Sequence, residues 1–136
     1  MLVQAIMKVI HFSASVSSEV LARAVNNTIF ATSNDELRPA MTGVYVNLGE
    51  KTATFVATDG HRLVRYRRTD LKSDNGNSII IPRKALNLLK ATLPIENTDV
   101  SIDFNMSNAF FKFGNIRMIC RLIDERFPDY ENVIPA

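Results

Sequence analysis

The stretch SIIIPRKALNLLKATL, residues 78–93, joins a short apolar run to an amphipathic segment. The run SIII has the length and composition of a buried strand, and Pro82 suits the first position of a helix, where no N–H donor is needed. In the segment that follows, Ala85, Leu88 and Leu89 recur at helical spacing and leave basic and amide side chains on the other face. The stretch therefore predicts a strand that leads directly into a surface helix.

The same order of elements stands near the start of the chain. Residues 9–16 (VIHFSASV) alternate between apolar and polar side chains, as a half-buried strand does. Ser17 is a good N-cap, and Glu19 lies in the first turn, where the helix dipole favours an acid. We expect a helix over 18–31 with its apolar face buried.

Three strands follow each predicted helix. Apolar or alternating segments between tight turns predict strands over 43–48, 52–58, 61–68, 99–104, 109–114 and 116–123. The helices begin near 18 and 82, so the order of elements repeats, although residue identity between the halves is negligible. This duplicated strand–helix–three-strand unit predicts an α+β fold. Its eight antiparallel-rich strands would form a sheet layer with both helices packed on one side.

The composition indicates one soluble globular domain. Of 136 residues, 46% are apolar and 22% are charged, which suffices for a core. Cys120 is the only cysteine, which excludes an internal disulfide and a cysteine-based zinc site and fits a cytoplasmic protein. Residues 1–11 lack the features of a signal peptide and are too short to span a bilayer. They are either a leader or vector-derived start or the beginning of the first strand, and the domain is expected over 12–136.

The segment ATDGHRLVRYRR, residues 57–68, admits two interpretations. Asp59 and His61 could form the acid–base pair of a small hydrolase. Asp-Gly is also among the commonest hairpin turns, because glycine accepts a positive φ and aspartate tolerates it. The sequence holds no nucleophile elbow, phosphate loop or metal-ligand set, so we favour the turn and expect no catalytic residue, cofactor or metal. The remaining acid–base candidates are Asp124, Glu125 and His11.

Leu63 lies next to arginines on the strand after this turn. It is either a single exposed leucine, which needs no function, or one wall of a peptide pocket near the tail, which is rich in proline and aromatic residues.

The outward faces of the two predicted helices carry a cationic stripe with little acid opposing it. These cations have one of two roles. They only keep a generic interaction module soluble, or they contact the phosphates of a nucleic acid. Formal net charge is only +2, so any nucleic-acid contact must come from such local clustering. The stripe consists of Arg23, Arg83, Lys84 and Lys90.

Three separated motifs resemble the DNA polymerase III β subunit family, the bacterial sliding clamps. They are FVATDGHRLVRY (55–66), IIIPRKALNLL (79–89) and CRLIDERFPDYENVIP (120–135). They stand in the family's order and spacing, with ATSNDELRPAMTGV (31–44) upstream, and the resemblance covers about residues 12–136. It implies the DNA-clamp fold and the middle domain of a three-domain chain.

The resemblance also implies a non-catalytic processivity factor of the replicative polymerase. In the family, two chains close a homodimeric ring whose helices line a hole and whose sheets face outward. Duplex DNA threads the hole without being read by sequence, so the cationic stripe would face phosphates. The family's ring closes through its first and third domains, and this domain alone is therefore expected to be a monomer.

The hairpin matches the family's pocket for short peptides of polymerases, the clamp loader and repair proteins. His61 would then be a rim residue and not a base. In the family the third domain supplies the other half of the pocket, so the isolated chain is expected to bind such peptides weakly. The matching positions are Met41, Thr58, Gly60, His61, Arg62, Leu63, Pro128 and Val133.

Overall fold

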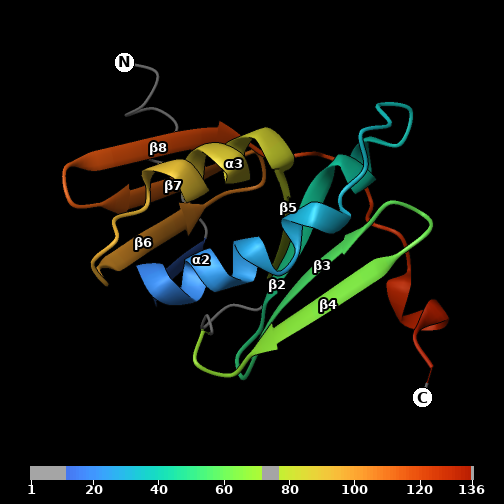
Figure 1. The fold of residues 1–136 in the computed structure, drawn as a ribbon, viewed down its shortest axis with the longest axis horizontal. Coiled ribbons are helices and arrows are strands. Elements are labelled where there is room, and N and C mark those ends of the chain that lie inside the picture. The colour runs from blue at the N-terminus through green and yellow to red at the C-terminus, as the bar shows by residue number, and fades with distance from the viewer. Residues whose placement is uncertain (1–11, 72–76, 136) are drawn as a thin grey trace.

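The computed structural model describes residues 12–71 and 77–135 (Figure 1). Strands and helices follow one another in the predicted order, with short 3-10 turns between some of them. In chain order the elements are β1 (Phe12–Ser17), α2 (Ser18–Asn26), η1 (Ile29–Ala31), η2 (Pro39–Thr42), β2 (Gly43–Leu48), β3 (Ala53–Thr58), β4 (Leu63–Arg68), β5 (Asn77–Pro82), α3 (Arg83–Thr92), β6 (Asp99–Phe104), β7 (Asn108–Phe113), β8 (Ile116–Arg121) and η3 (Tyr130–Val133). The residues at 9–11 of the predicted first strand, the expected leader 1–11 and His11 lie outside the described residues.

The strands form two antiparallel sheets, and the two halves of the chain exchange their first strands between them. The first-half sheet has the order β4-β3-β2-β5, and the second-half sheet has the order β1-β6-β7-β8. Ser17, which precedes α2, stands opposite Asp99, whereas Pro82, which precedes α3, stands opposite Gly43. Because these two junctions are equivalent, the duplication predicted from the order of elements is confirmed in three dimensions.

The eight strands do not make one continuous sheet. β5 and β8 lie at the edges where the two sheets meet, and the N–H of Ile123 donates to the carbonyl of Ile80 at 3.0 Å just beyond β8. The prediction of eight antiparallel strands is therefore confirmed, with a division into two sheets that the sequence pattern did not reveal.

Both helices pack on the same side of the sheets, as predicted (Figure 1). α2 and α3 contact each other, and their apolar faces close the main core over alternate residues of the strands. Ser17 caps α2 as predicted, because its hydroxyl oxygen accepts a hydrogen bond from the N–H of Val20 at 3.2 Å. The largest fully buried side chains include Phe104, Phe111, Leu71, Leu89, Val44, Val56 and Val100.

The first helix is shorter than the prediction of 18–31. It ends at Asn26, and a separate 3-10 turn, η1, covers Ile29–Ala31. Asn26, Asn27 and Thr28 are poor helix formers in sequence, and the buried hydroxyl of Thr28 bonds back to the carbonyl of Ala24 at 2.7 Å. This capping interaction stops the helix and lets the chain turn toward β3.

The second helix faces the core with a different leucine than predicted. Leu88 is 55% exposed, whereas Leu86 and Leu89 are buried. The three leucines lie so close together that the sequence does not determine the phase of the helix; the packing against α2 and the sheets selects the 86/89 face. The exposed arc of α3 therefore carries an apolar Leu88 between its polar side chains.

Candidate functional site

The β3–β4 hairpin is a turn built around the carboxylate of Asp59. Its Oδ1 accepts hydrogen bonds from the N–H groups of His61 at 2.9 Å and Arg62 at 3.0 Å. Gly60 takes a φ of +90°, which glycine adopts without strain. The hydroxyl of the buried Thr58 donates to the carbonyl of Arg62 at 2.7 Å and closes the turn from the strand side. The interpretation of Asp-Gly as a turn is thus confirmed.

The turn leaves Asp59 unsuited to act as a base. Hydrogen bonds from the N–H groups of His61 and Arg62 lower the pKa of its carboxyl below the ordinary value of 3.8, with the Arg62 side chain adding to the effect. Asp59 contacts His61 through this backbone N–H, not through the imidazole, which is exposed. Asp124 and Glu125 lie exposed on the tail and line a different cavity from Asp59 and His61. The geometry therefore does not assemble the acid–base pair of the hydrolase alternative.

Arg62 reaches from the hairpin to the segment after α2. Its Nε donates to Asp59 Oδ2 at 3.1 Å and its Nη2 donates to the carbonyl of Phe30 at 2.7 Å. Its guanidinium carbon lies over the Phe30 ring, 5.6 Å from the centroid. Two segments that are remote in sequence are thereby joined at the rim of the hairpin.

Leu63 belongs to a second hydrophobic cluster on the outer face of the first-half sheet, opposite the helices. Its buried members are Val56, Ile80 and Phe127, and Leu63 packs against them from the edge strand. Phe127 comes from the tail after β8 and stacks on Tyr45 with ring centroids 4.9 Å apart. The tail therefore runs across the outer face of the sheet and brings its aromatic side chains to the strand that carries Leu63.

The structure does not gather the other predicted pocket residues into one cavity with Leu63. Met41 is half-buried on η2, and its carbonyl accepts from the N–H of Ser33 at 2.8 Å. Pro128 is half-buried and lines a groove of about 560 Å³ with Tyr45 and Phe127. Val133, on η3, is 70% exposed.

His61 and Arg62 line a different hollow from Pro128. It has a volume of about 460 Å³, and Arg38 and Asp59 also line it. Leu63 lines neither hollow, so the candidate site is an open surface that comprises Leu63 and the two separate hollows. We call it the notch, defined by the eight predicted residues Met41, Thr58, Gly60, His61, Arg62, Leu63, Pro128 and Val133.

Several residues at this surface were not among the predicted ones. Phe127, Tyr45 and Tyr130 form its aromatic floor. The aromatic character of the tail is a signal for Phe127 and Tyr130, whereas Tyr45 lies on β2 and no pattern in the sequence indicates its role. Burial, followed by the neighbouring charge of Glu131, raises the pKa of the Tyr130 hydroxyl, so it stays protonated and uncharged at neutral pH. No spacing rule linked Phe30 to Arg62, because 32 positions separate them.

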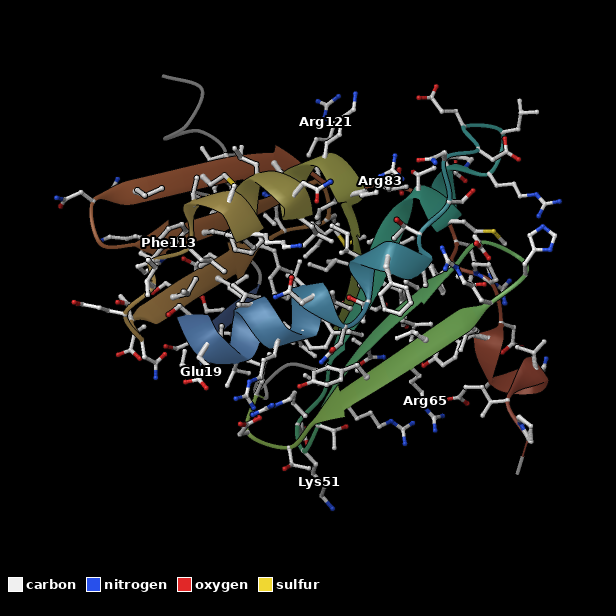
Figure 2. All side chains as sticks on the ribbon, viewed as in Figure 1. Glu19, Lys51, Arg65, Arg83, Phe113 and Arg121 are labelled. Carbon is white, nitrogen blue, oxygen red and sulfur yellow. The ribbon has the colours of Figure 1, made fainter. Side chains whose placement is uncertain are left out.

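The basic residues lie on the helices, on the opposite side of the sheets. Arg83 stands at the start of α3 (Figure 2), and Lys84 and Lys90 are exposed on the same helix. Arg23 is in the last turn of α2, but its guanidinium pairs with Glu19 at 3.0 Å. The expectation of little opposing acid is therefore wrong for Arg23, because an i,i+4 acid on the same face partly neutralises it.

Neither a metal cluster nor a membrane span is found in the part of the chain that the structure describes. No group of three or more acidic, histidine or cysteine side chains there could hold a metal ion. No helix there is long and apolar enough to cross a membrane.

Residues 15–129 match the family model of the DNA polymerase III beta subunit, central domain. A beta sliding clamp of Staphylococcus epidermidis is 37% identical over 120 residues, covering 88% of this chain and 32% of the relative. The chain thus spans about a third of the length of the curated relatives that it matches.

Solved structures agree with this match. The DNA polymerase sliding clamp of Bacillus subtilis superposes with a TM-score of 0.86 at 30% identity, over 92% of this chain and 33% of that one. A sliding clamp of Bartonella birtlesii bound to griselimycin superposes with a TM-score of 0.83 at 32% identity, over 93% of this chain and 35% of that one. The resemblance seen in the motifs is confirmed, and the chain belongs to the DNA polymerase III β subunit family, whose central domain it matches.

Proposed function

We propose that residues 12–136 form the middle of three domains in a non-catalytic processivity factor. Two copies of the longer chain would close a ring around duplex DNA, and peptides of polymerases, the clamp loader and repair proteins would dock on its outside. The observation that carries the proposal is the separation of two surfaces. Cations of two contacting helices lie on one side of the sheets, and the notch with its aromatic floor lies on the other.

The start of α3 favours a DNA-binding role for its cations. Arg83 and Lys84 occupy the first turn, where the helix dipole disfavours positive charge, and neither an acid in that turn nor a side-chain cap offsets them. Glu36, from the loop before η2, lines one hollow with both residues. The stability of α3 gives no reason for these two cations, and contact with phosphates supplies one. Lys84, Lys90 and Arg23 are exposed, but the charge of Arg23 is partly neutralised by its ion pair with Glu19.

Weak, sequence-independent contacts suffice for such a protein. An encircled duplex cannot leave sideways, so a few phosphate contacts can hold it without impeding sliding. The chain by itself would be a monomer, because the proposed ring closes through the other domains. It would act in the cytoplasm.

Duplex binding tests the DNA-facing surface. We expect the double variant Lys84→Glu, Lys90→Glu to reduce the affinity of the 136-residue chain for a fluorescent duplex at low salt, measured by anisotropy. The matched control is Arg65→Glu, Arg67→Glu, which makes the same charge change on exposed residues of β4. Figure 2 labels Arg65. Equal loss in both variants would mean that the duplex responds only to net charge, and the helix face would have no DNA role.

Griselimycin tests the notch, since the Bartonella birtlesii clamp structure contains it. We propose that this chain binds it weakly at the notch. Titration followed by NMR should shift the amide signals of Thr58, Gly60 and Leu63, and Leu63→Ala should weaken the binding. Signal changes confined to the helices, or no change at all, would contradict a ligand site at the hairpin.

A further inference from the structure

The guanidinium of Arg62 is held from two directions within the chain. Nε donates to the carboxylate of Asp59, and Nη2 donates to the carbonyl of Phe30. The guanidinium carbon also lies over the Phe30 ring, 5.6 Å from its centroid. Nη1 of Arg62 has no partner among the described residues. An arginine with three separate contacts is pre-oriented and loses little freedom when it makes another hydrogen bond.

Phe30 supplies two of these three contacts from a firmly anchored position. It lies on η1, whose neighbour Ala31 is fully buried and whose preceding residue Thr28 bonds to α2. Its own side chain is 53% exposed, which is unusual for a phenylalanine that serves only the core. The contact with Arg62 accounts for its position at the surface.

This inference rests on the proposed peptide notch. We propose that Phe30 is a positioning residue, which holds the Arg62 guanidinium in the orientation that a bound peptide needs. The ring orients the guanidinium plane, so that Nη1 meets a carbonyl or carboxylate oxygen of the bound segment. Phe30 itself need not touch the peptide.

The test separates the ring from the backbone carbonyl. Phe30→Leu removes the aromatic face and keeps the carbonyl, Phe30→Tyr restores the face, and Ile95→Ala is a control at a fully exposed apolar residue. We expect Phe30→Leu to weaken griselimycin binding by about three- to tenfold, because binding would then have to immobilise the Arg62 side chain. Phe30→Tyr and Ile95→Ala should bind like the parent chain, with thermal melting confirming that all three are folded.

A spectroscopic signal reports the positioning without ligand. The Nε–Hε resonance of Arg62 should carry a ring-current shift in the parent chain and in Phe30→Tyr, and should lose it in Phe30→Leu. Unchanged griselimycin affinity in Phe30→Leu, or an unchanged Arg62 resonance, overturns the role of Phe30 while leaving the notch intact. Absence of griselimycin binding by the parent chain overturns the notch itself.

Discussion

Asp59 illustrates how one side chain at the hairpin is committed to structure. It accepts two backbone hydrogen bonds and one from the Arg62 side chain, so its charge stabilises the turn that presents the notch. The same bonds lower its pKa, which ties the geometry of the turn to pH.

We expect the turn to loosen only in strong acid. Because the pKa of Asp59 is lower in the folded chain, its stabilisation is fully present above the ordinary value of 3.8 and is lost as pH falls through the folded pKa. The Asp59 side-chain carbon and the His61 amide, followed by NMR against pH, should titrate together with a midpoint below 3.8. Asp59→Asn, which keeps an oxygen acceptor, should show no such transition. A midpoint above 3.8 in the parent chain would contradict the hydrogen-bonding scheme.

At the level of residues, local chemistry was readable in the sequence and long-range pairing was not. The Asp-Gly turn and the Ser17 cap depend on neighbours within three positions, and both predictions hold. The Glu19–Arg23 pair also has a recognisable i,i+4 spacing, so this opposing acid is readable in the sequence. The Phe30–Arg62 contact depends on the path of the chain between them, which no local pattern encodes.

At the level of elements, the two helices of the duplicated unit start differently. α2 is capped by the Ser17 hydroxyl, whereas α3 follows Pro82 without a side-chain cap. The order and type of both were predictable because strand alternation and helical periodicity are strong signals. The end of α2 and the buried face of α3 were not, since they depend on a buried threonine hydroxyl and on packing between helices.

Removing the cap should cost measurable stability. We expect Ser17→Ala to lower the free energy of unfolding by about 1 kcal/mol, because the N–H of Val20 loses its acceptor. Urea unfolding followed by circular dichroism measures the change. Ser15→Ala, at an exposed position of the same strand, is the matched control and should change stability little. Similar losses in the two variants would show that the cap contributes nothing specific.

At the level of the whole molecule, two hydrophobic clusters lie on opposite sides of the first-half sheet. The main core lies under the helices, and the smaller cluster lies under the tail, centred on Phe127. The tail was predicted to be irregular and aromatic, but its path across the sheet follows from contacts with Tyr45 and Ile80 that no periodicity reveals. The notch is therefore less predictable from sequence pattern than the helix face.

Phe127 should hold the tail on the sheet. It is only 8% exposed, and we expect Phe127→Ala to lower the free energy of unfolding by about 3 kcal/mol through the cavity that it leaves. Because Pro128 follows it directly, the same variant should also weaken griselimycin binding at the notch. Urea unfolding and NMR titration measure the two effects. Ile95→Ala should change neither, and a Phe127→Ala chain as stable as the parent would mean that the tail does not depend on this side chain.

The exchange of first strands between the halves has a consequence for biosynthesis. β1 pairs with β6, so a chain emerging from the ribosome makes residues 12–17 long before their partners at 99–104. β2, β3 and β4 can form a meander early, but their sheet waits for β5. The first-half sheet can therefore close once residues 77–82 are made, whereas β1 must wait for the second half of the chain. Neither half of the duplicated pattern can complete a sheet from its own strands alone during translation.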